Sequence, residues 1–147
     1  MAGYLLSDTS VVYRLTKVSP DSVAYRGMIG ERWLAISFQT EAELQGFPFK
    51  EARRKRLDDL LAAALKLPHS EATSVWYSRV VQRRAELRRS GGSGGSAQDA
   101  DAWIISSALE HNLAMLSHDQ EQVHLGRAMG LKVHTNLPGL RETNPKL

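Results

Sequence analysis

Four acidic residues stand where helices are expected to begin or strands to end: Asp8, Glu43, Asp101 and Asp119. Carboxylates that are brought close together repel one another, so a group of them persists only with a cation between its members. Oxygen ligands in a chain without cysteine favour Mg²⁺ or Mn²⁺ over Zn²⁺. The four acids are therefore candidate metal ligands, although each one alone could instead start a helix.

The stretch 98–119 contains two of these acids. Its first half has an apolar stripe at helical spacing, formed by Ile104, Ile105 and Ala108. At about 100° per residue, Asp101 falls on the same stripe, where a charge costs several kcal/mol unless a partner satisfies it. Asp99 lies about 160° around the helix. We expect Ser96–Asp99 to form a capping box that starts this helix.

Short apolar runs place the other acids near strand ends. Tyr4–Leu6 predicts a strand that leads into Asp8, and Leu113–Leu116 predicts a buried strand that ends at Asp119. Trp33–Ser37 is nearly continuous in apolar residues, which is typical of a parallel strand covered on both faces. Ligands gather at the carboxyl ends of strands in open α/β sheets, so these positions favour a site.

Local capping offers a simpler explanation for two of the acids. Thr9 or Ser10 is expected to cap the helix that follows the first strand, and Asp8 could favour its start through charge. Thr40 and Glu43 match a capping box, with Thr40 as the N-cap and Glu43 three residues later. Independent capping at four sites is a weaker explanation than one shared cause, which is a common cation.

The remaining pattern predicts an α/β fold with one domain over residues 1–147. Helical spacing predicts helices over 20–29, 50–67 and 71–89, and a further helix that follows Asp119 and runs through 129. A last short strand is expected over 131–133. The residues expected to face inward on the first three are Val23, Ala24, Met28, Leu57, Leu60, Leu61, Ala64, Val75, Trp76 and Val80. The order β-α-α-β-α-α-α-α-β-α-β implies a three-layer sandwich with a mainly parallel central sheet.

Composition indicates the expected character of the remaining segments. Ser90–Ser96 reads SGGSGGS and predicts a flexible Gly/Ser loop, either a mobile loop beside a cleft or an engineered linker. The polar tail 137–147 contains two prolines and is expected to be loosely ordered. Arg53–Arg56 and the arginines of 71–89 are typical of solvated helix faces, with RNA contact as the secondary interpretation. A net charge of +3 is compatible with a nucleic-acid substrate without requiring one.

Four motifs link the candidate acids to a known family. They read Leu-Leu-x-Asp-Thr-Ser at 5–10, Thr-x-x-Glu-Leu at 40–44, Asp-Ala-Trp-Ile-x-x-x-Ala-Leu at 101–109 and Leu-Ser-x-Asp at 116–119. With them the chain resembles PIN-domain ribonucleases, and within that family it is most similar to the VapC-type toxins of bacterial toxin–antitoxin pairs. The resemblance runs from Tyr4 to about Val133, and the last two motifs are the specific ones.

The resemblance implies a role for each matching residue. The metal ligands would be Asp8, Glu43, Asp101 and Asp119, holding Mg²⁺ or Mn²⁺. Ser117 would hydrogen-bond one of the carboxylates, and Thr9 or Ser10 would contribute less. Asp99 and Glu121 are further acids near the site whose place in its outer shell is left open.

The activity implied is endoribonuclease cleavage by a metal-activated water, which needs no nucleophilic side chain. The resemblance also implies an RNA substrate, a cognate antitoxin that covers the cleft, a homodimer and a cytoplasmic site of action. No run approaches the roughly 18 apolar residues that a membrane span requires, so no membrane association is expected. The start of the chain lacks the basic region of a signal peptide.

Three alternatives stay open from the sequence. A PIN-like module could bind RNA or a protein partner without cleaving it. A receiver-type phosphoacceptor would need an Asp after a middle strand, but Trp33–Ser37 is followed by Phe38. A zinc site could combine Asp119 with His118 and His124, although the chain has no His-x-x-x-His pair on a predicted helix.

Overall fold

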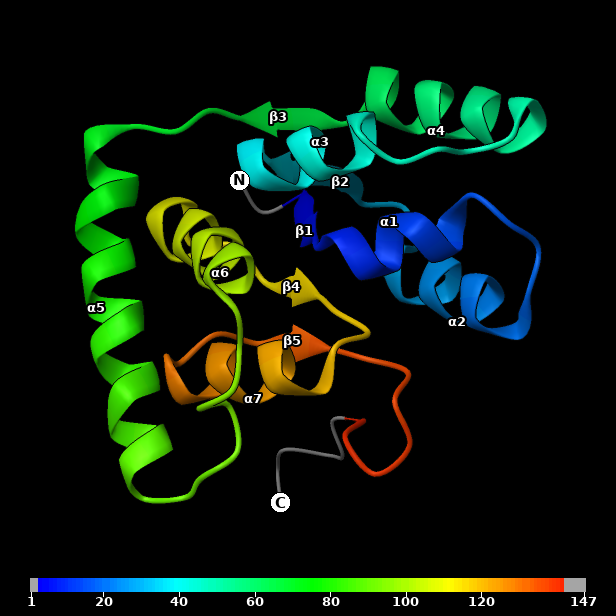
Figure 1. The fold of residues 1–147 in the computed structure, drawn as a ribbon. Coiled ribbons are helices and arrows are strands. Elements are labelled where there is room, and N and C mark those ends of the chain that lie inside the picture. The colour runs from blue at the N-terminus through cyan, green and yellow to red at the C-terminus, as the bar shows by residue number, and fades with distance from the viewer. Residues whose placement is uncertain (1–2, 142–147) are drawn as a thin grey trace.

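The computed structural model describes residues 3–141 and contains five parallel strands that form one sheet (Figure 1). The strands are β1 Tyr4–Ser7, β2 Trp33–Ser37, β3 Leu65–Leu67, β4 Met115–Leu116 and β5 Val133–His134, in the spatial order β3-β2-β1-β4-β5. The helices are α1 Thr9–Leu15, α2 Pro20–Ile29, α3 Phe38–Gln45, α4 Glu51–Ala63, α5 Glu71–Arg89, α6 Asp99–His111 and α7 Gln120–Ala128. The predicted α/β fold with a parallel central sheet is confirmed.

The sheet lies between two layers of helices because its strands are apolar on both faces. Leu6, Ala35 and Met115 pack in one cluster with residues of α5, α6 and α7. Their neighbours Leu5 and Leu116 pack instead against α1 and α2, and Ile36 of β2 packs with α3 and α4. This alternation follows the period of two in a strand and produces the three layers.

The predicted helix over 50–67 is wrong at its carboxyl end. Helix α4 ends at Ala63, and β3 follows at Leu65–Leu67 and pairs in parallel with β2, with Leu67 opposite Ser37. Leu61 and Leu65 are four residues apart, as on one helix face, whereas Leu65 and Leu67 are two apart, which is the spacing of one strand face. Pairing with β2 decides in favour of the strand.

Several predicted boundaries and inward faces also differ from the structure. The last two strands are shorter or shifted, since β4 begins at Met115 and β5 begins at Val133. Val23 is 66% exposed and Val75 is 50% exposed, although both were expected to face inward. On α2 the buried side chains are Ser22 and Tyr25, because Tyr25 reaches the carboxyl end of β4.

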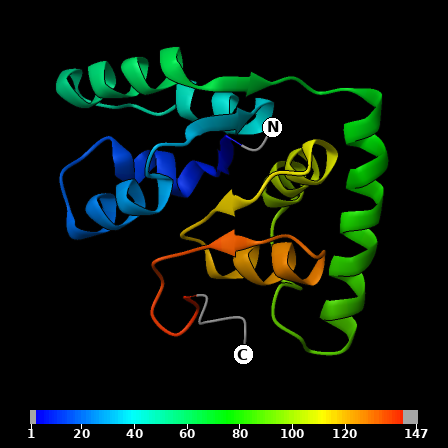
Figure 2. The same cartoon turned by 180° about the vertical axis from the view of Figure 1, so that it is seen from behind.

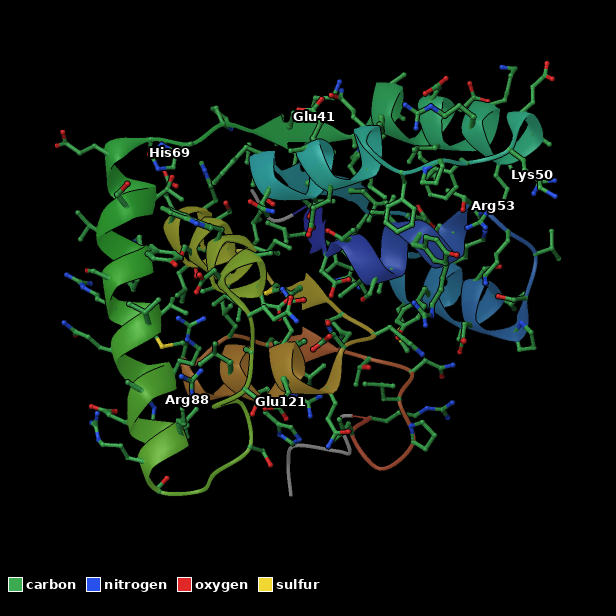
Figure 3. The ribbon with its side chains drawn as sticks, in the orientation of Figure 1. Glu41, Lys50, Arg53, His69, Arg88 and Glu121 are labelled. Atoms are coloured by element: carbon green, nitrogen blue, oxygen red, sulfur yellow. The ribbon has the colours of Figure 1, made fainter. Side chains whose placement is uncertain are left out.

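Long helix α5 runs along one side of the molecule and ends in the loop that leads to α6 (Figure 1, Figure 2). This loop is the segment 90–96, and it is held from both sides. The backbone amides of Gly94 and Ser96 donate to Glu121 Oε1 at 3.1 and 3.0 Å, and Arg88 Nε donates to the carbonyl of Gly95 at 2.9 Å. Figure 3 shows Arg88 on α5 and Glu121 on α7 beside the loop.

Two of the loop glycines are required by packing. A Cβ at Gly94 would lie 2.9 Å from the backbone nitrogen of Leu125, and Gly94 has a φ of +98°. A Cβ at Gly95 would lie 2.7 Å from the backbone of Arg88. The segment is therefore an anchored turn with defined contacts, although its composition alone predicts a flexible loop. Glu121, whose place in the outer shell of the site the sequence left open, accepts hydrogen bonds from the backbone of this turn.

The carboxyl-terminal segment is described as far as Arg141. Leu137 and Leu140 pack against the cluster of α5, α6 and α7, so this part of the predicted loose tail contacts the core. The rest of the predicted tail, 142–147, lies outside the described residues. No helix within residues 3–141 is long and apolar enough to cross a membrane.

Candidate active site

The four acids singled out in the sequence line one pocket of about 280 Å³ near the carboxyl ends of β1 and β4. The other residues that line it are Thr9, Ser10, Tyr13, Phe47, Ile104 and Gln122. Parallel strands bring their carboxyl ends to the same edge of a sheet, which explains why acids that are distant in sequence meet here. We call this the carboxylate pocket.

Asp8 lies at the base of the carboxylate pocket and caps α1. Its side chain is buried, with 1% of the residue exposed, and accepts a hydrogen bond from Val11 N at 2.9 Å. Ser10 Oγ donates to it at 2.7 Å, and Ser117 Oγ donates to Oδ2 at 2.5 Å. The predicted cap at Thr9 or Ser10 is wrong, because Asp8 itself is the N-cap.

Burial raises the pKa of Asp8 to about 7. Hydrogen bonds from Ser117, Ser10 and Val11 act in the opposite direction, and the negative charge of Asp101 raises the pKa further. Desolvation thus outweighs three donors, which is unusual for a carboxylate that only caps a helix. With a pKa of about 7, the charged form of Asp8 is disfavoured near neutral pH, and a bound cation would favour it.

Asp101 faces the carboxylate pocket from the first turn of α6, as the helical count predicted. Its Oδ2 accepts a hydrogen bond from Gln98 N at 2.9 Å, so Gln98 is the N-cap and Asp101 is the third helical residue. Burial raises the pKa of Asp101 to about 6, and the charges of Asp119 and Glu43 raise it as well. The capping box expected at Ser96–Asp99 is therefore displaced by two residues.

Asp119 caps α7 and is tied to Asp8 through a serine. Its Oδ1 accepts from Gln122 N at 2.9 Å, and its own amide donates to Ser117 Oγ at 3.1 Å. Ser117 Oγ in turn donates to Asp8, and the amide of His118 donates to Ser10 Oγ at 2.9 Å. These bonds fix the turn after β4 against the start of α1.

Glu43 reaches the pocket from the middle of α3. Helix α3 begins one turn earlier than predicted, with Ser37 as the N-cap accepting from Thr40 N at 3.1 Å. Glu43 therefore makes no capping box with Thr40, so helix capping does not explain why an acidic residue stands at this position. The hydroxyl of Thr9 instead donates to Glu43 Oε1, which links α1 to α3 across the pocket.

Asp99 points away from the carboxylate pocket. Its side chain is 75% exposed and forms an ion pair with Arg84 of α5 at 2.9 Å. It is not among the residues that line the pocket. Asp99 thus joins α6 to α5, and its proximity in sequence to Asp101 does not make it part of the site.

The histidine alternative is not supported by the geometry. His118 Nδ1 lies 2.6 Å from the hydroxyl of Tyr25, and Nε2 lies 3.8 Å from Asp21 Oδ2. Burial lowers the pKa of His118, and the charge of Arg14 lowers it further, whereas Asp21 acts in the opposite direction. The ring belongs to a hydrogen-bonded network behind the pocket.

Two aromatic side chains of the pocket, Tyr13 and Phe47, were not anticipated from the sequence. Tyr13 lies on the exposed side of α1, and Phe47 follows α3 in the sequence Gly-Phe-Pro-Phe. A hydrogen bond and the charge of Arg53 lower the pKa of Tyr13. The sequence feature that could have indicated Phe47 is its position in a loop, four residues after Glu43, rather than on an apolar helix face.

The donor set fits a hard divalent cation, although no ready-made cluster exists. Within residues 3–141, no three His, Cys, Asp or Glu side chains converge on one point as metal ligands. Asp8, Asp101 and Asp119 each accept from backbone amides, and Glu43 accepts from Thr9. All four offer oxygen only, and burial together with neighbouring acids raises the pKa values of Asp8 and Asp101, which a bound cation would oppose.

A comparison with models of protein families identifies the family of this chain. A family model of the PIN domain matches residues 5–128. The chain belongs to the PIN domain family. No curated protein is similar enough in sequence to count as a match.

Solved structures with the fold of this PIN domain include three toxin–antitoxin proteins. VapBC2 from Rickettsia felis bound to a promoter DNA fragment is 21% identical over 90% of this chain and 98% of that chain, with a TM-score of 0.68. DNA-bound VapBC from Salmonella typhimurium is 17% identical over 90% and 97%, with a TM-score of 0.67. VapBC-1 from nontypeable Haemophilus influenzae is 22% identical over 90% and 97%, with a TM-score of 0.65.

Proposed function

We propose that this PIN domain is a divalent-metal-dependent endoribonuclease and the toxin of a toxin–antitoxin pair. The observation that carries the proposal is the carboxylate pocket, in which four acids from separate elements meet and burial raises the pKa of two of them. Membership of the PIN family supports nuclease activity as the class of function. The VapBC structures that share the fold support the toxin role.

The residues that would hold Mg²⁺ or Mn²⁺ are Asp8, Glu43, Asp101 and Asp119. When bound, such an ion lowers the pKa of a water molecule and stabilises a leaving oxygen, which is the chemistry that phosphodiester hydrolysis requires. Ser117 and Ser10 hold Asp8 in place, and Thr9 holds Glu43. Ile104 adds an apolar side chain to the lining of the pocket.

Cleavage of a labelled RNA mixture tests the proposed activity directly. We expect cleavage with Mg²⁺ or Mn²⁺ and its loss in excess EDTA, because the proposed mechanism activates water through a bound metal ion. Full activity in EDTA would rule out the mechanism. Binding of RNA with no cleavage under either metal would favour the alternative, a PIN-like module that binds without cutting.

The toxin role and its partners need a separate experiment. We expect induced expression of the protein to arrest bacterial growth and expression of Asp101→Asn to leave growth unaffected. The same proposal includes a cognate antitoxin that covers the carboxylate pocket, a homodimer and action in the cytoplasm. Sedimentation of the purified protein tests the dimer, and unarrested growth despite cleavage in vitro would remove the toxin role.

A further inference from the structure

Three aromatic rings pack together beside the carboxylate pocket, and we call them the aromatic wall: Tyr13, Phe47 and Phe49. The ring centroids lie 5.5 Å apart for Tyr13 and Phe47, 5.7 Å for Tyr13 and Phe49, and 5.3 Å for Phe47 and Phe49. Tyr13 and Phe47 line the same pocket as the four acids. An aromatic surface thus borders the place where a phosphate would be cut.

Phe47 is the open ring of this wall. It is 43% exposed, whereas Phe49 packs against the cluster of α3 and α4 residues. Besides the carboxylate pocket, Phe47 lines an adjoining hollow together with Ala42, Glu43, Gly46 and Pro48. Of the large apolar side chains exposed in the described part of the chain, Phe47 alone borders the acids.

Arg53 of α4 holds the wall in place. Its guanidinium lies 4.5 Å from the centroid of Tyr13 and 4.8 Å from that of Phe49. It also donates to Thr16 Oγ1 at 2.9 Å and to the carbonyl of Tyr13 at 3.2 Å. Figure 3 shows Arg53 above the carboxyl half of α1. Arg53 therefore holds Tyr13 and Phe49, and Phe47 packs against both of these rings, which lowers the ordering cost of binding.

The charge around the aromatic wall suits a polyanion rather than an apolar partner. Arg53 lies over two of its rings, and Lys17 Nζ lies 5.2 Å from the centroid of Tyr13. The other arginines of this part of α4 point back to the protein, since Arg54 donates to the carbonyl of Leu44 and Arg56 to that of Thr16. They brace α4 against α3 and α1 and add positive charge beside the wall.

We propose that Phe47 stacks an unpaired base of single-stranded RNA next to the phosphate at the carboxylate pocket. The inference rests on the proposed nuclease function and narrows its substrate to RNA with an exposed base. Bases of a duplex face one another and cannot reach a ring on the protein surface, whereas bases of loops and single strands stack on aromatic side chains. Stacking tolerates any base because every base has a π face.

The test compares Phe47 variants that separate stacking from apolar packing. Phe47→Ala removes the side chain, Phe47→Leu keeps an apolar group, and Phe47→Tyr keeps the ring. Trp33→Ala is the matched control, because Trp33 is 61% exposed and lies on β2 among residues that do not line the carboxylate pocket. Melting temperatures of all four variants establish that each is folded.

Two measurements report on stacking. The first is KM for a single-stranded RNA, which we expect to rise roughly 5- to 100-fold in Phe47→Ala and Phe47→Leu and to stay near wild type in Phe47→Tyr. The second is the fluorescence of a 2-aminopurine RNA oligonucleotide, with Ca²⁺ in place of Mg²⁺. Wild type and Phe47→Tyr should quench it, and Phe47→Ala and Phe47→Leu should not.

Each other outcome overturns the inference. Normal KM and quenching in Phe47→Leu would show apolar packing without stacking. An equal loss in Trp33→Ala would show that the effect is not local to the pocket. A smaller oligomer for Phe47→Ala with unchanged RNA binding would assign the ring to a protein contact. If wild type cleaves no RNA, the proposed function fails, but the quenching series still decides whether Phe47 stacks a base.

Discussion

Two carboxyl groups of this PIN domain, Asp8 and Glu110, accept hydrogen bonds from similar partners but have pKa values shifted in opposite directions. Asp8 accepts hydrogen bonds from the hydroxyls of Ser10 and Ser117, and its pKa is raised to about 7. Glu110 accepts from Ser70 Oγ at 2.6 Å and from Thr73 Oγ1, and its pKa is lowered. The number of hydroxyl donors does not determine which carboxyl stays ionised.

The difference comes from burial and from neighbouring charge. Burial raises the pKa of both groups, but Glu110 is only partly enclosed and lies near His69 and His111, so its donors and their charges prevail. Asp8 is nearly inaccessible and faces Asp101. Glu110 therefore joins α6 to the start of α5, whereas Asp8 is poised to accept a cation.

The largest expected effect concerns catalysis. Asp8→Asn and Asp101→Asn should each lower RNA cleavage at saturating Mg²⁺ by more than about 100-fold, the upper end for losing an outer partner of a metal ligand. Glu110→Gln should retain most activity, because Glu110 lies outside the carboxylate pocket. Initial rates of cleavage measure this. Comparable loss in the Glu110 variant would end the distinction between the two carboxyls.

The second largest difference between Asp8 and Glu110 is expected in how the free energy of unfolding depends on pH. Since the folded pKa of Asp8 is above its unfolded value, metal-free protein should lose stability as pH rises from about 4 to about 7, by up to about 4 kcal/mol. Asp8→Asn should lack this loss, so it should be the more stable protein at pH 7.5 and nearly equal at pH 4. Urea unfolding in EDTA measures the difference.

Glu110 serves as the control for that experiment. Its lowered pKa means that its stabilisation is present above its unfolded pKa and is lost as pH falls through the folded value. Glu110→Gln should therefore be less stable than wild type at pH 7.5, and the difference should shrink as pH falls, opposite to the trend for Asp8→Asn. If Asp8→Asn is the less stable protein at pH 7.5, Asp8 acts mainly as the cap of α1.

Metal binding should produce a smaller stabilisation. Mg²⁺ at 100 times its Kd should stabilise the folded state by about 2.7 kcal/mol, because it binds the folded protein preferentially. We expect Glu110→Gln to keep the resulting rise in melting temperature and Asp8→Asn to lose most of it. Differential scanning fluorimetry with and without Mg²⁺ measures both. An equal rise in the two variants would place the ion elsewhere.

The smallest effect is expected for Asp99. Asp99→Asn removes an ion pair with Arg84 whose acidic partner is mostly exposed, so it should cost less than about 1 kcal/mol and leave cleavage near wild type. Asp101→Asn, two residues away, is the matched variant that should be inactive. An inactive Asp99→Asn beside an active Asp101→Asn would require the site to be redrawn around Asp99.

Helical spacing in the sequence was sufficient to place Asp101. Its apolar neighbours Ile104 and Ile105 define a face, and the structure directs Asp101 to the same side and Asp99 to the other. Motif positions likewise selected Asp8 and Asp119, because a polar residue directly after an apolar run marks a strand end. These features are local, so a count along the chain reveals them.

Tertiary packing decided the features that local spacing leaves ambiguous. Leu65–Leu67 becomes β3 because β2 offers a parallel partner, although Leu65 on its own would extend the apolar spacing of α4. Ser37 rather than Thr40 caps α3, which frees Glu43 to face the pocket. Gly94 is needed because α7 lies against it, not because the loop is loose.

The properties of the site also depend on packing. The sequence indicates which residues carry charge, but the pKa of Asp8 is set by the elements that enclose it and by Asp101, which is 93 positions away in the chain. Within the aromatic wall, Tyr13 and Phe47 lie side by side because α1 packs against the loop after α3, and Arg53 lies over the Tyr13 ring. Spacing records the faces of single elements, whereas desolvation and like-charge repulsion arise between elements and require the folded chain.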